Sequence, residues 1–223
     1  MDSRWLFNFG AEFYGWFTAQ ATWRASCMRL AAHLPASDGR PPRLVDLGCG
    51  PGVSTIEIAR LRPEGLLVGL DAAPRMLAEA RRRSTAARVT GRVTWVLGDV
   101  TRLPFASESL DALTGHSFLY LLPDRPRALA EMLRVLRGGG RLVLMEPSSR
   151  PASPRSVLRV SRDPRHLLAV GLWRPFSRLH GRFSVETLRA TLEGAGFVRC
   201  QVEETLGGLG LLAWVDKPEQ ADG

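Results

Sequence analysis

The chain has 223 residues, of which 45% are hydrophobic and 23% are charged, a composition typical of a globular protein with one sizeable core. Lys217 is the one lysine among its 30 basic residues, and the formal net charge is +8. A bias toward arginine codons explains such a count, but excess positive charge also favours an anionic partner, either nucleic acid or anionic lipid.

Cysteine usage and hydropathy set the expected compartment. The chain has three cysteines, an odd number, and their spacing does not match a metal site: Cys27, Cys49 and Cys200. We therefore expect a reducing compartment, no disulfide framework and no bound metal. The sequence has no run of about 18 uncharged apolar residues, so no membrane-spanning helix is predicted. The start of the chain lacks the plan of a signal peptide, and the expected location is therefore cytoplasmic, with peripheral membrane contact as a further expectation.

Residues 1 to 42 precede the first strand pattern and are rich in aromatic side chains. Apolar residues recur there at helical spacing and share one face, namely Trp5, Phe9, Phe13, Trp16, Trp23, Cys27, Leu30 and Leu34. We expect a helical segment that either packs against a sheet or forms a lid over an apolar acceptor.

Residues 43 to 147 alternate strand and helix patterns. Strands are predicted at residues 43–48, 66–71, 92–99, 110–117 and 141–147. Helices are predicted at residues 53–61, 73–83 and from residue 125 to an end marked by Arg137 and Gly138, with Pro74 in the first turn of the second helix. This alternation predicts a mostly parallel sheet with helices on both faces.

The remaining segments interrupt this pattern once and then complete it. Residues 148 to 183 are rich in arginine, and we expect a helical insertion there. Residues 184 to 223 hold a predicted helix at 184–197 and predicted strands at 197–205 and 209–217. Ser184 suits the helix N-cap, but Thr187 stands where a capping box has Glu or Gln, so no box is expected. The expected fold is an α/β, Rossmann-like, doubly wound sheet of seven mostly parallel strands.

A glycine-rich bend follows the first strand, in "LVDLGCGPGVSTIEIA" at residues 44–59. Gly48, Gly50 and Gly52 allow either a tight turn without a ligand or close approach of a ligand to the backbone. Val53 stands where a dinucleotide fingerprint has its third glycine, and the bend has no phosphate-binding lysine. Asp46 precedes the bend and suits a ligand that carries positive charge.

Two further acids follow the next two strands. Asp71 ends the second strand, where a carboxylate can accept hydrogen bonds from both hydroxyls of a ribose. Asp99 ends the third strand, where a carboxylate can accept from the exocyclic amine of adenine. Each acid alone could simply cap a loop. Asp46, Asp71 and Asp99, however, lie at the ends of three successive predicted strands, and together they favour a nucleoside-like ligand.

Four stretches in this order, "LVDLGCGPG", "LLVGLDAAPRMLAEAR", "GDVTRLPFASESLDALT" and "LRVLRGGGRLVLMEP", resemble the successive motifs of class I S-adenosylmethionine-dependent methyltransferases. They are most similar to the group with the ubiquinone/menaquinone-biosynthesis and phospholipid methyltransferases. The resemblance covers residues 43 to 147 and the helix at 184–197. It implies S-adenosylmethionine as the cofactor and S-adenosylhomocysteine as its product, and it is much less specific for the acceptor.

The resemblance also implies a set of cofactor-binding residues. The implied contacts are Gly48, Cys49 and Gly50 with the methionine part, Asp71 with the ribose, Ala72 and Met76 with the adenosine, Asp99 and Val100 with adenine, and Gly115 and His116 beneath the cofactor. Asp46 completes this expected set. The N-terminal tyrosine–acid motif of the family is only partly kept, because Gly15 follows Tyr14.

Methyl transfer from a sulfonium needs alignment and water exclusion, and it needs a base only when the nucleophile must lose a proton. His116, Tyr120 and Tyr14 are the candidate catalytic residues, and Glu146 and His180 are further candidates. For each of them, a packing or surface role is the simpler interpretation.

The flanking segments are expected to select the acceptor. Residues 150 to 182 carry eight arginines, one acid and many apolar residues, a pattern typical of a helical cap on anionic lipid. A solvated cap, a pocket for a small anionic molecule and contact with nucleic acid stay open. We therefore expect a methyltransferase for a small hydrophobic or lipid-like acceptor. The alternatives are an RNA methyltransferase, a non-catalytic cofactor-binding module and, least favoured, a dinucleotide oxidoreductase.

Overall fold

The computed structural model describes residues 20–36 and 39–219. The expected N-terminal lid is therefore described only from residue 20 onward. The aromatic residues Trp5, Phe9, Phe13 and Trp16 and the candidate Tyr14 lie outside the described residues.

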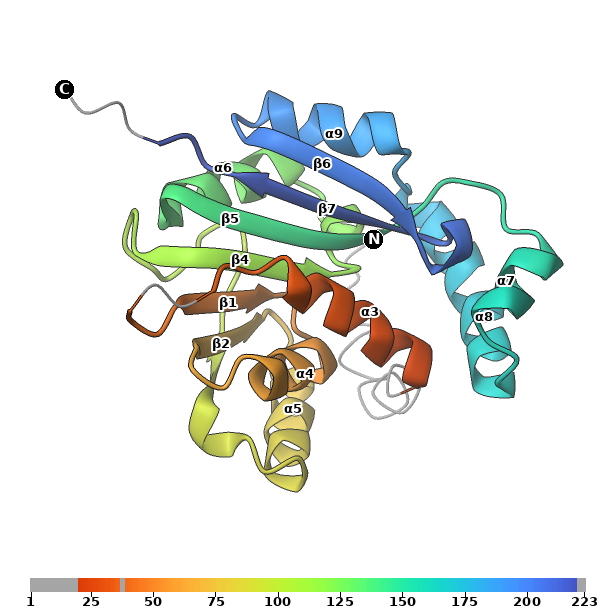
Figure 1. Cartoon of the computed structure of the whole chain (residues 1–223), viewed down its shortest axis with the longest axis horizontal. Coiled ribbons are helices and arrows are strands. Elements are labelled where there is room, and N and C mark those ends of the chain that lie inside the picture. Colours follow the sequence, from red (N-terminus) through yellow and green to blue (C-terminus); the bar gives the residue numbers. More distant parts are fainter. Residues whose placement is uncertain (1–19, 37–38, 220–223) are drawn as a thin grey trace.

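Seven strands form one sheet, and its elements follow the predicted alternation (Figure 1). The strands are β1 (Arg43–Leu47), β2 (Leu66–Asp71), β3 (Val93–Leu97), β4 (Leu110–His116), β5 (Leu136–Pro147), β6 (Val198–Thr205) and β7 (Gly210–Asp216). The described helices are α3 (Ala21–Ala32), α4 (Val53–Leu61), α5 (Pro74–Ala86), α6 (Arg125–Val135), α7 (Pro154–Val160), α8 (Pro164–His180) and α9 (Val185–Gly194).

The strand order is β3-β2-β1-β4-β5-β7-β6. β1 pairs in parallel with β2 and with β4, so that Val45 lies beside Val68 and Leu113. β7 runs antiparallel to both of its neighbours, β5 and β6. The predicted mostly parallel, doubly wound sheet is confirmed.

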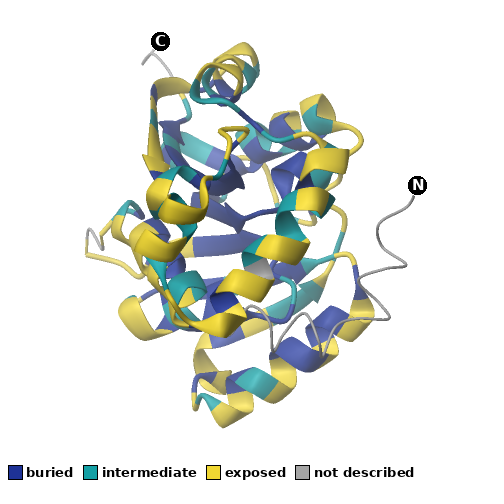
Figure 2. Ribbon diagram, turned by 90° about the vertical axis from the view of Figure 1, so that its right-hand side faces the viewer, coloured by how far each residue is buried: buried dark blue, intermediate teal, exposed yellow. Residues whose placement is uncertain are grey.

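Each face of the sheet has its own apolar core, because neighbouring strand residues point to opposite faces. On β5, Leu142 and Leu144 belong to the core under α6 and α9, and Val143 and Met145 belong to the core under α3 and α4. Figure 2 shows the buried strands enclosed between helices whose outer surfaces are exposed.

Two local details differ from the sequence predictions. α6 ends at Val135, because Leu136 is already extended and pairs with Leu110 at the start of β5. The helix end predicted at Arg137 and Gly138 is therefore too late, and the glycine run belongs to β5. The expected absence of a capping box was wrong, because the Thr187 hydroxyl replaces a carboxylate and accepts from the Ser184 backbone N–H at 2.8 Å.

The arginine-rich insertion forms two helices, α7 and α8, beside the start of α3 (Figure 1). Asp163 caps α8 by accepting a hydrogen bond from the Arg165 backbone N–H at 2.8 Å. Arg125 anchors the other end of α8, since its guanidinium donates to the carbonyl oxygens of Tyr120 and His180. In the described ranges, no helix is both long and apolar enough to cross a membrane.

Candidate cofactor and acceptor site

A pocket of about 600 Å³ opens at the carboxyl ends of β1 to β4, and we call it the large pocket. It lies where the strand order reverses between β1 and β4, the usual position of a ligand in an open α/β sheet. Its lining combines glycines, acids and apolar side chains with a few polar and basic ones, and includes Gly48, Gly50, Leu70, Asp71, Ala72, Met76, Asp99, Val100, His116, Ser117, Phe118, Leu121, Leu122, Asp124, Arg127 and His180.

The glycine bend after β1 forms one wall of the large pocket. Gly48 has a φ of +60°, a conformation that other residues rarely adopt, and a Cβ on it would lie 2.8 Å from the Phe118 Cβ. A Cβ on Gly115 would lie 2.1 Å from the Phe118 ring. Gly115 therefore supports Phe118 from below and is not itself part of the pocket lining.

Asp71 links the ends of β1 and β2 at the pocket. Its two carboxylate oxygens accept from the backbone N–H groups of Gly50 and Ala73, each at 2.8 Å. Burial raises the pKa of Asp71, while these backbone donors lower it. Each oxygen keeps further acceptor capacity, so the same carboxylate can hold the bend and also meet ligand hydroxyls.

Asp46 and Cys49 lie outside the pocket lining. Asp46 is fully buried, and its Oδ2 accepts from the hydroxyls of Ser54 and Thr55, each at 2.6 Å. Burial raises the pKa of Asp46 to about 6. The Cys49 side chain is also buried, and its Sγ lies close to Gly69. Both side chains support the bend from the core side.

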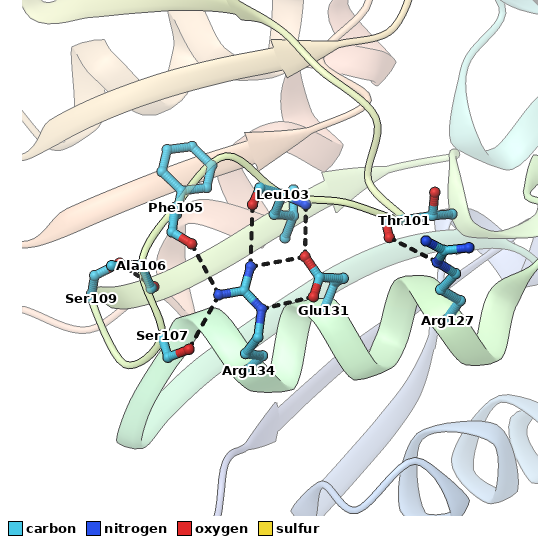
Figure 3. A network of polar contacts seen from close by, with 9 residues as sticks. All are labelled: Thr101, Leu103, Phe105, Ala106, Ser107, Ser109, Arg127, Glu131 and Arg134. Carbon is cyan, nitrogen blue, oxygen red and sulfur yellow. Dashed lines mark hydrogen bonds and ion pairs between the residues drawn. The ribbon is translucent and has the colours of Figure 1, made fainter.

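The loop after β3 carries Asp99 and Val100 into the pocket lining, and α6 holds this loop (Figure 3). Glu131 accepts from the Leu103 backbone N–H at 2.8 Å. Arg134 pairs with Glu131 and donates to the carbonyl oxygens of Leu103 and Phe105. Hydrogen bonds from Arg134 lower the pKa of Glu131, which keeps the pair charged.

A second, smaller pocket of about 60 Å³ lies between α3, α8 and the ends of β4 and β5, and we call it the small pocket. Its lining is mostly apolar and includes Trp23, Met145, Val170, Trp173, Leu206 and Leu209, together with Gln20, Thr22, Ser26, Glu146 and His166. His116 and Ser117 are the two lining residues that the large and small pockets share.

The residues at this junction are held tightly. Ser117 has a φ of +56°, unusual for a residue other than glycine, and its N–H donates to the Met145 carbonyl at 2.6 Å. His116 is buried, its ring lies 4.1 Å from that of Trp23, and its Nε2 lies 2.7 Å from the Ser26 hydroxyl. Burial lowers the pKa of His116 to about 3, so the imidazole is neutral at pH 7.

Glu146 ends β5 beside the same junction. Its buried carboxyl accepts from the backbone N–H groups of Phe118, Leu119 and Tyr120, at 2.9 to 3.2 Å. Burial raises the pKa of Glu146 to about 7, although these donors lower it in part. Glu146 thus shapes the turn that separates the two pockets.

The other sequence candidates have different positions. Tyr120 is buried against the edge of the His180 ring, at 6.4 Å between ring centroids, and it lines neither pocket. His180 lines the large pocket.

Sequence reasoning missed Ser26, Ser117, Phe118 and His166. Nothing in their local pattern marked them, because Ser26 and His166 reach the site from helices outside the sheet motifs.

These features define the class of protein. A glycine bend after β1 and carboxylates after β2 and β3, on a sheet whose last strands include one antiparallel strand, form the arrangement of class I S-adenosylmethionine-dependent methyltransferases. Residues 45–144 match the family model described as a methyltransferase domain. This part of the chain belongs to that family.

Known relatives are similar over part of their length. The chain is 35% identical over 158 residues to a demethylmenaquinone methyltransferase of Roseiflexus castenholzii, covering 70% of this chain and 57% of that protein. It is 38% identical over 109 residues to the ubiquinone/menaquinone biosynthesis C-methyltransferase UbiE of Dinoroseobacter shibae, covering 49% and 44% of the two chains. The chain thus spans about half the length of these relatives.

Solved structures share the fold over nearly the whole chain. A putative S-adenosyl-L-methionine-dependent methyltransferase from Methanococcus maripaludis has a TM-score of 0.75 and 20% identity, covering 97% of this chain and 95% of that one. A putative methyltransferase solved with the Trm112 activator of Haloferax volcanii has a TM-score of 0.72 and 20% identity, covering 96% and 98%.

The large pocket fits S-adenosylmethionine, the cofactor of this class. The partly buried Asp71 carboxylate faces the pocket with spare acceptor capacity, and the backbone at Gly48 and Gly50 is open to close approach. Met76 and Val100 offer apolar surface for a flat base. When bound, the cofactor supplies a methyl group activated by a sulfonium sulfur.

Proposed function

We propose that the protein transfers a methyl group from S-adenosylmethionine to a small hydrophobic or lipid-like acceptor. The observation that carries this proposal is the junction at His116 and Ser117, where a pocket suited to the cofactor meets an apolar pocket. Two substrates in adjoining pockets would meet at such a junction in a fixed orientation. Alignment of this kind is the main contribution that a protein makes to methyl transfer.

The contacts proposed for the cofactor follow the expected set. Gly48 and Gly50 form the wall for its methionine part, and Asp71 accepts from the ribose hydroxyls. Ala72, Met76, Asp99 and Val100 surround the adenosine as a group. Asp46, Cys49 and Gly115 act indirectly, since they hold the bend and Phe118 in place.

The acceptor is proposed to be a ring compound of the quinol type. One relative is named a demethylmenaquinone methyltransferase, and another is named a ubiquinone/menaquinone biosynthesis C-methyltransferase. The small pocket supports such an acceptor, because Trp23, Trp173 and Leu209 offer aromatic and aliphatic surface. His116 is the proposed acceptor-side residue. Tyr120 is less suited to that role because it lines neither pocket, and Tyr14 stays a prediction.

The exposed surface of α8 supports contact with an anionic membrane. Leu168, Leu172 and Leu179 share one face of this helix and are 49%, 51% and 84% exposed. The same insertion carries exposed arginines, among them Arg155 and Arg159 on α7 and Arg162 between α7 and α8. An exposed apolar face between cationic side chains fits anionic lipid, which would deliver a hydrophobic acceptor to the small pocket.

Methyl transfer tests the function directly. The full chain is incubated with radiolabelled S-adenosylmethionine and with separate lipid, RNA and small-molecule fractions. We expect label in the lipid or small-molecule fraction. Label in RNA would support the alternative acceptor, and no transfer despite S-adenosylhomocysteine binding would support a binding module. Calorimetric binding of NAD without binding of S-adenosylhomocysteine would refute the cofactor assignment.

Vesicle co-sedimentation tests the membrane contact. The protein should sediment with anionic vesicles, less at high salt, and not with neutral ones. The triple variant Arg155→Glu, Arg159→Glu and Arg162→Glu should lose binding, at roughly 1 kcal/mol per arginine engaged. Its control replaces the exposed Arg81, Arg88 and Arg92 with Glu, which changes the net charge equally. Equal loss in both triples, or no binding by the unmodified protein, would exclude this surface as the membrane contact.

A further inference from the structure

The hydroxyl of Ser26 determines which nitrogen of His116 carries a proton. Its Oγ lies 2.6 Å from the Trp23 carbonyl oxygen and 2.7 Å from His116 Nε2. A carbonyl oxygen only accepts, so the single hydroxyl proton is donated to Trp23. His116 Nε2 must then carry a hydrogen and donate it to Ser26.

The other ring nitrogen of His116 is consequently an acceptor. The neutral imidazole has one N–H, and with Nε2 protonated the lone pair is on Nδ1. In the described part of the chain, the buried Nδ1 has no hydrogen-bond partner. A buried acceptor without a partner is costly, and such a group in a binding site indicates that a ligand supplies the missing donor.

The surroundings of His116 indicate what that ligand looks like. The Trp23 ring lies against the imidazole and fixes its plane. The other walls of the small pocket include Met145, Val170 and Leu209, which suit an apolar ring. Besides His116, two titratable groups line the same pocket, Glu146 and His166. Glu146 is already engaged by three backbone donors, and His166 Nδ1 lies 3.1 Å from the Thr22 hydroxyl.

We propose that His116 Nδ1 accepts a hydrogen bond from a hydroxyl on the aromatic ring of the acceptor, and that Ser26 is a positioning residue that holds His116 in the required tautomer. This inference rests on the proposed function, since it assigns the small pocket to the acceptor. It makes the pocket selective for a ring that carries a free hydroxyl over the same ring without one.

Calorimetry with two probes tests this selectivity in the presence of S-adenosylhomocysteine. The probes are 1-naphthol, which has a hydroxyl donor, and 1-methoxynaphthalene, which has none. One neutral hydrogen bond predicts about fivefold to tenfold tighter binding of 1-naphthol by the unmodified protein. His116→Asn should keep much of this preference, because its side-chain oxygen replaces Nδ1, and His116→Leu should reduce the ratio to within about twofold.

The tautomer is tested separately by ¹⁵N NMR of protein labelled at its four histidines. At pH 7 the His116 signals should show a proton on Nε2 alone, and Ser26→Ala should remove this fixed state and reduce the probe preference. Ser84→Ala is the matched control, since Ser84 is also buried in a helix and donates to the carbonyl three residues earlier, at 2.8 Å. Circular dichroism checks that each variant folds.

The results separate the inference from the proposed function. If S-adenosylhomocysteine does not bind the unmodified protein, the proposed function itself fails. If it binds but both probes bind equally, or if His116→Leu keeps the full preference, the role of His116 is refuted. A proton on Nδ1 of His116 in the unmodified protein would refute the role of Ser26.

Discussion

Asp71 combines two tasks in one side chain, since it holds the glycine bend and faces the large pocket. We expect Asp71→Asn to weaken binding of S-adenosylhomocysteine by about 1–3 kcal/mol, the scale for losing charge-assisted hydrogen bonds. Calorimetry measures the change, with the exposed Glu64→Gln as a control for the lost charge. Unchanged affinity in a folded Asp71→Asn protein would show that Asp71 is purely structural.

Glu146 and His116 are both buried at the pocket junction, and they make stability depend on pH in opposite directions. The pKa of Glu146 is raised from 4.5 to about 7, so between these values the folded state holds a proton that the unfolded state has lost. The free energy of unfolding therefore falls as pH rises through this range. The pKa of His116 is lowered from 6.5 to about 3, so its contribution rises with pH between these values.

Urea unfolding at several pH values separates the two contributions. Glu146→Gln removes the falling contribution, so this variant should gain stability relative to the unmodified protein as pH rises from 5 to 7. His116→Asn removes the rising contribution and should lose relative stability over pH 4 to 6. Each slope is at most about 1.4 kcal/mol per pH unit. Parallel curves for all three proteins would contradict these pKa shifts.

At the scale of elements, α6 helps to shape the large pocket, although its Arg134–Glu131 ion pair lies outside that pocket. Arg134 and Glu131 hold the loop between β3 and β4, which carries Asp99 and Val100 (Figure 3). The side of the large pocket lined by Asp99 and Val100 therefore depends on contacts between a helix and a loop.

Removal of Arg134 should loosen this loop. Arg134→Met leaves the carbonyl oxygens of Leu103 and Phe105 without this donor, and we expect stability to fall by about 1–3 kcal/mol. Hydrogen exchange should accelerate in residues 99–108 more than in β1 or β5. Arg60→Met, which removes only an exposed pair with Glu57 at 2.9 Å, is the control. Equal exchange rates in both variants would show that the loop keeps its conformation without Arg134.

At the scale of the whole molecule, the topology brings four strand ends to one edge of the sheet. Residues from β1, β2, β3 and β4 meet there because the strand order reverses between β1 and β4. Near the opposite end of β4, Arg40 forms an ion pair with the buried Asp111, with atoms 2.6 Å apart. The large pocket and this ion pair thus lie at opposite ends of β4.

Ligand binding should therefore stabilise the folded state, with the strongest local protection at the carboxyl ends of β1 to β4. At 100 times its dissociation constant, S-adenosylhomocysteine should raise the free energy of unfolding by about 2.7 kcal/mol. Hydrogen exchange should slow mainly at residues 48–52, 71–73, 98–101 and 116–122. A thermal shift with NAD in place of S-adenosylhomocysteine, or protection centred on Asp111, would contradict the proposed position of the cofactor.

The sequence by itself determined the order of the elements and the cofactor side of the site. Buried parallel strands are continuous apolar runs, and their carboxyl ends must share one edge, so Gly48, Asp71 and Asp99 could be placed together from their positions after strands. Sequence patterns predicted the ends of helices and strands less accurately. Leu136 leaves α6 because it pairs with Leu110, and the capping box at Ser184 uses a threonine hydroxyl.

Only the tertiary structure revealed the small pocket, which we propose for the acceptor. Ser26 meets His116 from 90 residues away, and Thr22 meets His166 across 144 residues, so no spacing in the sequence could join them. These contacts depend on how α3 and α8 pack beside the sheet, and neither helix belongs to its repeating strand–helix pattern. Backbone hydrogen bonds between parallel strands bring the strand ends together in any chain with this strand–helix pattern. The small pocket, in contrast, depends on side-chain packing that is particular to this chain.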